Sequence, residues 1–473
     1  MRSLTRLNVN PHISGLIYSK AAELLLVGLL LVFIYPFFFL ISGVDPTVPP
    51  SEQSQIKIVY FLREAFPFFS VAIALMSRGS AVSLPGTSTI YPVICLASTM
   101  WSVDPYVTFK FATVMSLYVL AIAAVCQVLD IDVFCKLIVK VLAFLILASV
   151  VMALALPKYG IHQVNDELGD VHIGTWRGVF VHKNQLGPVA AVVLFISMFF
   201  SRLISASVGF RLMCIVAAAA CLVFAHSSGS WVALGMLMVY YFLIRTVPVS
   251  PNFLVLIVFG VSALAFVSFS SFGDDVVGLV GRDMTFTGRT EIWRIVLDAI
   301  WQRPLLGYGF AAATDFIRPL LTAQLGSAAV DPHNGYLEVL LATGIVGLAG
   351  LAFSIGSVII TGIGRVKTST GRETECFMLL LSFPILSSVN AIFEAGPISG
   401  VEGTLGALTY LSLTAVPFYL RLERGKYQLP TSAAHTGSAA RRSANGWRAA
   451  RPRDTGELAP SVRISPPIDP DPA

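Results

Sequence analysis

Cations and a histidine gather in one polar segment of the sequence, residues 273–334, which lies between long apolar runs. A guanidinium is a planar fork that binds phosphate through two hydrogen bonds at once. A neutral imidazole can take a proton from a hydroxyl group. The segment therefore predicts a site that holds a phosphate and moves a proton. It contains no lysine but carries Arg282, Arg289, Arg294, Arg303 and Arg318, and it ends with His333 and Asn334.

Two of these side chains stand where a helix is expected to begin. Arg289 precedes a short helical stretch, 291–302, and His333 precedes an apolar helix expected from Gly335. Helix N-termini present free N–H groups and partial positive charge, which attract anions and disfavour imidazolium. We expect Arg289 to bind the phosphate, with Arg294 nearby, and His333 to be a neutral base. A salt bridge to a neighbouring carboxylate remains open for Arg289, and a helix cap or headgroup contact for His333.

A second polar segment, residues 157–184, carries three histidines and two cations. His162, His172 and His182 are spaced by ten residues, whereas zinc-ligand pairs usually stand two to five residues apart. That spacing gives no support to a metal site and favours a structural role for the first two. Arg177 and Lys183 precede another predicted helix, so they are expected to contribute to an anion site. The alternative is an interfacial belt of Trp and Lys at the lipid headgroups.

The elements that position these residues are membrane-spanning helices. Hydrophobic residues make up 55% of the chain and charged residues 12%, and the mean hydropathy is +0.77. Apolar runs of about 20 residues match a bilayer core of roughly 30 Å. We predict an all-α, polytopic bundle of about 12 spans at 21–42, 57–76, 88–101, 111–128, 137–156, 185–201, 210–226, 229–245, 252–272, 335–361, 375–392 and 403–420.

Charge asymmetry orients this bundle. Lys and Arg recur in alternate connections, which the positive-inside rule assigns to the cytoplasm. Both termini are then cytoplasmic, and segments 157–184 and 273–334 are large periplasmic loops of a bacterial inner-membrane protein. Residues 1–420 form the membrane domain. Residues 421–473, rich in Pro, Ser, Ala and Arg, are expected to be a disordered cytoplasmic tail.

The composition also argues against a disulfide framework, a cysteine metal site and nucleic-acid binding. The six cysteines lie in or beside predicted spans and form no CxxC pair, so neither a disulfide framework nor a cysteine metal site is indicated. No metal or other cofactor is expected. The net charge of +5 comes largely from the tail, and no basic face with interleaved aromatic residues predicts nucleic-acid binding.

At five motifs the sequence resembles the bacterial O-antigen ligase and polysaccharide polymerase superfamily, particularly exopolysaccharide polymerases of the ExoQ type. Their order along residues 100–350 carries the resemblance, and four of the five fall on the predicted outer face. They are Trp101-Ser-Val-Asp-Pro, Arg177-Gly-Val-Phe-Val-His-Lys-Asn184, Thr287-Gly-Arg-Thr-Glu-Ile-Trp293, Pro304-Leu-Leu-Gly-Tyr-Gly309 and His333-Asn-Gly-Tyr-Leu-Glu338.

The resemblance implies an integral membrane glycosyltransferase that uses a polyprenyl-diphosphate-linked glycan, such as an undecaprenyl diphosphate derivative, as donor. It implies that Arg177 and Arg289 neutralise the diphosphate, with Lys183, Arg294 and Asn334 as further binding residues, and that His333 is the base on an acceptor glycan. The reaction that the resemblance implies inverts the anomeric centre of the donor sugar and uses no metal. Other polysaccharide-export proteins are further candidate partners. A transporter or flippase of lipid-linked saccharides is the alternative, because it would bind the same anionic lipid.

Overall fold

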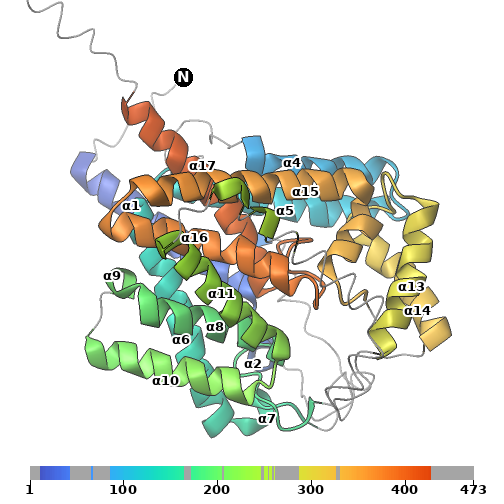
Figure 1. Ribbon diagram of the computed structural model, residues 1–473, viewed down its shortest axis with the longest axis horizontal. Coiled ribbons are helices and arrows are strands. Elements are labelled where there is room, and N and C mark those ends of the chain that lie inside the picture. Colours follow the sequence, from blue (N-terminus) through green and yellow to red (C-terminus); the bar gives the residue numbers. More distant parts are fainter. Residues whose placement is uncertain are drawn as a thin grey trace, which may run out of the picture. The chain divides into compact units, whose positions relative to one another are not determined.

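The computed structural model is helical throughout the part of the chain that it describes (Figure 1). One isolated β-bridge pairs Ile161 with Trp176. Residues 1–422 form one compact unit and residues 423–473 a second. The predicted all-α class is confirmed. The described residues are 11–42, 65–67, 86–163, 172–204, 207–246, 250–253, 255–257, 260, 287–325 and 331–427.

The helices follow the predicted spans closely in position. In chain order they are α1 (Pro11–Ile34), α2 (Phe38–Ser42), α4 (Gly86–Ala97), η2 (Ser98–Met100), α5 (Pro105–Cys126), α6 (Ile131–Ala155), α7 (Pro157–Gly160), α8 (Lys183–Phe199), α9 (Ser201–Ile204), α10 (Val208–Phe224), α11 (Ser228–Thr246), α13 (Thr287–Gln302), α14 (Ala312–Leu325), α15 (Gly335–Thr368), α16 (Gly371–Asn390) and α17 (Thr404–Tyr427).

Several of these helices can cross a membrane. Among the described residues, α5, α6, α11, α15 and the 404–422 part of α17 are long and apolar enough, and α8 and α10 are shorter apolar helices. Most of predicted spans 57–76 and 252–272 lies outside the described residues. The multi-pass membrane class is thus supported, while the number of about 12 spans stays a prediction.

The predicted first span, 21–42, is two helices. α1 ends at Ile34, and α2 begins at Phe38. Pro36 explains the break, because a proline disfavours helical backbone at the residue before it. Tyr35 and Phe37, on either side of the proline, have positive φ angles of 61° and 60°.

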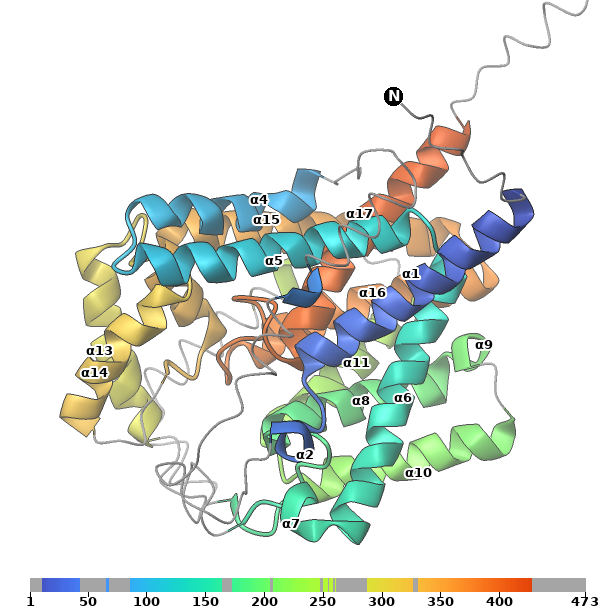
Figure 2. The ribbon, with the colours of Figure 1, turned by 180° about the vertical axis from the view of Figure 1, so that it is seen from behind.

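One large apolar core joins most of the helices. α6 packs against α1, α8, α10 and α16, and α15 packs against α4 and α16. Figures 1 and 2 show α4, α5 and α15 running side by side along one edge. The site described below lies where α5, α8, α13 and α15 begin.

A second, smaller core belongs to α13, α14 and the first turns of α15. On α13, buried Ile292, Val296 and Ala299 recur at spacings of three and four residues, which places them on one face of the helix. They pack with Ile317 of α14 and Leu341 of α15. This core fixes the segment 287–325 beside the start of α15.

A break in α15 receives the turn that joins α13 to α14. Gly344 adopts φ 63° and ψ −165° inside the helix, and a Cβ there would collide with the Leu305 backbone. The turn supplies partners to the interrupted helix: Tyr308 N donates to Leu341 O at 2.9 Å, and Ile345 N donates to Pro304 O at 2.9 Å. Backbone groups freed by a break in a membrane helix need such partners.

The Trp101-Ser-Val-Asp-Pro motif holds the same turn from the other side. Trp101 Nε1 donates to Leu306 O at 2.8 Å, and Val103 N donates to Tyr308 O at 2.9 Å. The side chain of Asp104 caps α5 by accepting from two backbone N–H groups. The motif is therefore a structural bend, as its sequence indicates.

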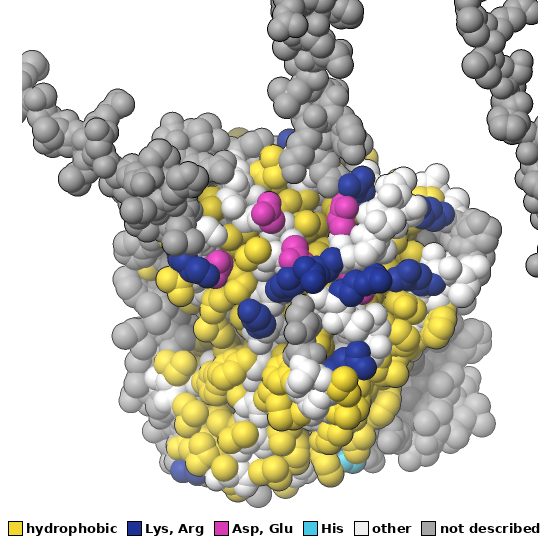
Figure 3. Space-filling view, turned by 90° about the vertical axis from the view of Figure 1, so that its left-hand side faces the viewer, with side chains coloured by type: hydrophobic (Ala, Val, Ile, Leu, Met, Phe, Trp, Pro, Cys, Tyr) yellow, Lys and Arg dark blue, Asp and Glu magenta, His cyan; other side chains and the backbone are white. Residues whose placement is uncertain are grey.

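Lys and Arg gather on another face of the unit, drawn in Figure 3. Several side chains at the predicted cytoplasmic helix ends form ion pairs. Lys136 Nζ lies 2.6 Å from Asp132 of the same helix, and Arg372 at the start of α16 lies 3.5 Å from that same carboxylate. These positions agree with the charge asymmetry read from the sequence.

Candidate functional site

Asn334 caps α15 and connects it to the loop that follows α16, residues 391–403. Its Oδ1 accepts from Tyr336 N and Leu337 N at 3.0 Å each. Its Nδ2 donates to Ile392 O at 3.2 Å. The side chain is fully buried, and an Asn at this position is a favoured N-cap. In this arrangement Asn334 positions its neighbour, His333.

His333 is held by Asp331 in a strained backbone conformation. Its φ is 46°. The Asp331 carboxylate accepts from His333 N at 2.7 Å and lies 3.2 Å from its Nδ1. That contact favours a proton on Nδ1 and leaves Nε2 as the acceptor. Burial lowers the pKa of His333 below its usual value; Asp331 opposes the shift and Arg289 adds to it. The imidazole is therefore neutral near pH 7.

Arg289 stands in the first turn of α13 and reaches the loop 391–403. Its Nη1 donates to Phe393 O at 2.7 Å, and its Nη2 lies 3.9 Å from Glu394 Oε1. The side chain is 22% exposed, so it is partly accessible to a ligand. A second hydrogen bond ties α13 to the residue before His333: Trp293 Nε1 donates to Pro332 O at 3.0 Å.

Glu394 is a site residue that sequence reasoning did not select. Its Oε1 also accepts from Asn184 Nδ2 of α8 at 2.7 Å. Burial raises the pKa of this carboxyl to about 7, against the opposing effects of Arg289, Asn184 and Lys183. We call Lys183, Asn184, Arg289, Asp331, His333 and Glu394 the polar cluster. It unites the two polar segments of the sequence, residues 157–184 and 273–334.

Three histidines fix the start of α8, where Lys183 and Asn184 stand. The rings of His162, His172 and His182 have centroids 5.0 to 5.9 Å apart. His162 Nε2 accepts from Lys183 N at 3.2 Å, and His182 Nδ1 accepts from Asn184 N at 3.1 Å. A structural role was expected for His162 and His172, and the ring contacts show that His182 shares it. Spacing by ten residues did not reveal the convergence, although a polar residue directly before a helix is a cap signal.

Arg177 has a different environment from Arg289. It is only 1% exposed. Its Nε donates to Tyr159 O at 2.8 Å, and its guanidinium stacks 4.1 Å from the centroid of the Phe39 ring. These contacts are with α7 and α2, and they hold the 157–160 turn against the segment that follows α1.

The remaining arginines of residues 273–334 take separate positions. Arg294 lies on an exposed side of α13 and pairs with Glu291 of the same helix at 2.5 Å. Arg303 stacks over the Tyr308 ring at 4.9 Å. Arg318 pairs with Asp315 at 3.3 Å on α14. Arg282 lies outside the described residues.

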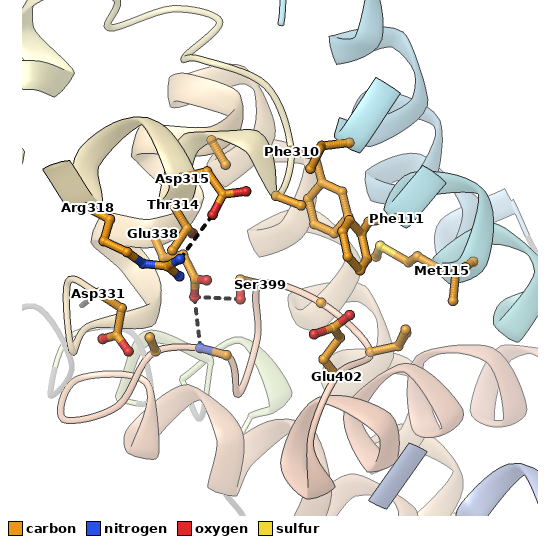
Figure 4. A pocket seen from close by; sticks show the side chains of 18 residues that line it. Phe111, Met115, Phe310, Thr314, Asp315, Arg318, Asp331, Glu338, Ser399 and Glu402 are labelled. Carbon is orange, nitrogen blue, oxygen red and sulfur yellow. Dashed lines mark hydrogen bonds and ion pairs between the residues drawn. The ribbon is translucent and has the colours of Figure 1, made fainter. Parts of the chain in front are cut away.

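A cavity of about 410 Å³ adjoins the polar cluster and shares Asp331 with it (Figure 4). Its walls come from α5, α14, the start of α15 and the loop 391–403. Glu338 of α15 points into it and accepts from Gly396 N at 2.8 Å and Ser399 Oγ at 2.7 Å. Sequence reasoning noted Glu338 only as the end of a motif, because the cavity exists only through tertiary contacts.

The arrangement joins a phosphate-binding type of side chain to a neutral base. Arg289 and Lys183 can neutralise an anion, and His333 can accept a proton beside them. Within the described ranges, no group of three or more His, Cys, Asp or Glu side chains is arranged to hold a metal ion.

Comparison with known proteins locates the resemblance more closely. Residues 212–352 match the O-antigen ligase family. This range contains Arg289, His333 and Asn334, whereas Arg177 and Lys183 precede it.

Exopolysaccharide production protein ExoQ of Rhizobium meliloti (strain 1021) is 29% identical to this chain over 143 residues, which are 28% of this chain and 32% of ExoQ. The match thus spans about a third of the length of this curated relative. The family match and the ExoQ similarity agree with the resemblance seen in the motifs. Over residues 212–352, the chain is similar to the O-antigen ligase family.

Proposed function

We propose that this chain is a glycosyltransferase of exopolysaccharide or O-antigen synthesis. It transfers a glycan from a polyprenyl diphosphate carrier to a hydroxyl group of an acceptor glycan. The observation that supports this most directly is geometric: α13, which carries Arg289 in its first turn, is bonded through Trp293 Nε1 to Pro332 O at 3.0 Å, next to His333. A cation suited to diphosphate therefore lies beside a neutral base, within the family-matched range.

In the proposed reaction the acceptor oxygen attacks the anomeric carbon of the donor sugar. The bond between that carbon and the diphosphate oxygen breaks, and the lipid diphosphate leaves with the electron pair. His333 Nε2 takes the proton of the acceptor hydroxyl. A single displacement of this kind inverts the anomeric centre. Negative charge grows on the leaving diphosphate, where Arg289 and Lys183 stabilise it. The reaction as proposed requires no metal.

The other predicted binding residues take different parts in this proposal. Asn334 positions His333 through the cap of α15. Arg294, whose side chain is 60% exposed on α13, contributes to the electrostatic field around the donor. Arg177 remains a candidate diphosphate ligand, and its burial makes it the residue most in need of a direct test.

We propose further that the site faces the periplasm and that both termini are cytoplasmic. Segments predicted to lie outside are bonded to each other: Asn184 to Glu394, and Arg289 to Phe393. The proposed partners are the lipid-linked donor, the acceptor glycan, the bilayer and other polysaccharide-export proteins.

The proposal is tested by His333→Ala. This variant should reach the membrane at the wild-type level and produce no polymer in a strain that lacks the native gene. Purified wild-type protein in detergent should elongate a lipid-linked repeat and release lipid diphosphate without any other protein. Wild-type polymer yield from His333→Ala would refute the role of the base. Failure of the purified protein to elongate, with transport of the intact lipid in vesicles, would favour the transporter alternative.

A further inference from the structure

The cavity beside the polar cluster is lined by carboxyl groups at both ends, by Arg318 at the end of Asp315 and by aromatic rings at the end of Glu402. Figure 4 shows Asp315, Asp331 and Glu338 toward one end and Phe111 and Phe310 at the other. Its volume of about 410 Å³ falls within the range of about 300–1,000 Å³ that is usual for small-molecule sites. Such a cavity suits a ligand with hydroxyl groups on its edges and apolar C–H faces.

The charged residues that line the cavity differ from those of the polar cluster, where the diphosphate is proposed to bind. Among the described residues, four carboxyl groups line the cavity, those of Asp315, Asp331, Glu338 and Glu402, and one guanidinium, that of Arg318. Arg318 is itself paired with Asp315 at 3.3 Å. Acidic groups thus outnumber basic ones among the described lining residues, which disfavours a phosphate or a uronic acid. Cations for the diphosphate, Lys183 and Arg289, lie instead in the polar cluster.

Carboxylates are strong acceptors for sugar hydroxyls. The oxygens of a carboxyl group accept hydrogen bonds from hydroxyls in both protonation states, and the protonated form can also donate one. Glu338 is held in place by two donors, the N–H of Gly396 and the hydroxyl of Ser399, both of which bond to Oε2. The carboxyl group is thus oriented before a ligand arrives, which reduces the entropy lost on binding.

We infer that this cavity binds a neutral sugar residue of the acceptor glycan. Glu338 and Asp315 accept its hydroxyls, and Phe111 and Phe310 contact its C–H face. Asp331 lines the cavity and also lies 3.2 Å from His333 Nδ1, so the cavity adjoins the residue that holds the base. The inference rests on the proposed function, since it assigns the ligand as that reaction's acceptor.

Binding of free oligosaccharide tests the cavity without catalysis. The probe is the repeat oligosaccharide, released from its lipid carrier by mild acid, and the protein is the full chain carrying His333→Ala in lipid nanodiscs. Thr314→Trp fills the cavity from α14. Leu320→Trp is the matched control, because this residue lies on the same helix, is 41% exposed and is not part of the lining.

We expect Thr314→Trp to weaken binding at least tenfold and Leu320→Trp to leave the affinity within twofold. Glu338→Gln preserves side-chain size and should weaken binding about fivefold. Oxidation of the oligosaccharide's primary hydroxyls to carboxylates should also weaken it at least tenfold. Equal affinity in Thr314→Trp and Leu320→Trp, equal affinity for oxidised and neutral probe, or no binding at millimolar probe would overturn the inference.

A transfer assay separates this inference from the proposed function. If wild-type protein releases no lipid diphosphate but loses oligosaccharide binding through Thr314→Trp, the transferase proposal fails and the sugar site stands. If wild-type protein elongates the donor and Thr314→Trp retains the wild-type acceptor KM, the transferase stands and the sugar site fails. In the supporting result, acceptor KM rises at least tenfold in Thr314→Trp while donor KM is unchanged.

Discussion

At the scale of single residues, Arg289 and Arg177 illustrate how one side-chain type serves two purposes. Both follow or precede a glycine in a motif, and the resemblance implies the same role for both. Arg289 is partly exposed at 22% and reaches Glu394, whereas Arg177 is buried against Phe39 and the carbonyl of Tyr159. The two guanidiniums should therefore differ in what their loss changes.

Arg289→Gln should raise the donor KM at least tenfold with little change in the melting temperature. Charge-assisted hydrogen bonds contribute about 1.5–3 kcal/mol each, and Arg289→Lys should also raise the donor KM because an ammonium lacks the planar fork of a guanidinium.

Arg177→Gln should instead lower the free energy of unfolding by about 1–3 kcal/mol, since a buried carbonyl loses its donor. Thermal unfolding and donor kinetics measure the two effects. A raised donor KM without lost stability in Arg177→Gln would make Arg177 a diphosphate ligand.

The acid side of the pH–rate profile reports on His333. The neutral imidazole is the active form, and burial holds its pKa below the usual value of 6.5. Activity should thus persist below pH 6.5 and fall only as the pH drops through the lowered pKa. Because the Asp331 carboxylate raises this pKa, Asp331→Asn should move the acid limb to lower pH.

Initial rates of lipid diphosphate release across pH would check this. Asp331→Asn keeps an oxygen that can accept from His333 N and Nδ1, so the charge is removed with little loss of geometry. Glu291→Gln is a suitable control, because Glu291 pairs with Arg294 on the exposed side of α13. An acid limb that moves to higher pH in Asp331→Asn would exclude His333 as the titrating base.

At the scale of elements, the broken helix α15 depends on one glycine. Gly344 lies at φ 63° and ψ −165°, a region occupied essentially by glycine and worth about 1–3 kcal/mol in strain for other residues. Gly344→Ala should therefore lower stability by at least that amount, because the added methyl group would also meet the Leu305 backbone.

Gly364→Ala on the same helix is the matched control. No neighbouring atom lies within 4 Å of a Cβ built there, and alanine favours helix over glycine by about 1 kcal/mol. Fluorescence-detected melting of the two purified variants gives the comparison. Similar melting temperatures for Gly344→Ala and wild type would mean that the turn 304–310 does not require the break.

Periodic patterns predicted the elements better than the site they build. The apolar spacing of α13 is local to the chain, and the predicted 291–302 helix was found within Thr287–Gln302. The pairing of Asn184 with Glu394 joins residues 210 positions apart, and no local pattern encodes it. The same holds for the three converging histidines and for Glu338 in the cavity. Tertiary packing, which a single sequence does not display, brings these together.

At the scale of the whole molecule, the orientation in the membrane can be tested by labelling introduced cysteines, with the native thiols as the background. All six cysteines are buried, so a membrane-impermeant maleimide should label intact cells weakly. Gln302, in the predicted outer segment that carries Arg289 and His333, and Thr370, directly before α16, are both exposed. In intact cells Gln302→Cys should be labelled, and Thr370→Cys should react only after permeabilisation. The reverse pattern would place the candidate site in the cytoplasm.

The two hydrophobic cores have a consequence for how the site can come apart. Arg289 is carried by the smaller core of α13 and α14, whereas Lys183, Asn184 and Glu394 belong to elements of the larger one. Proteins unfold locally in cooperative units of one chain whose stabilities differ, and units with less buried apolar surface unfold first. A local opening of the smaller unit separates the two halves of the site while the bundle stays folded. The lifetime of the assembled site is then set by its weaker half, and the bundle's own stability does not protect it.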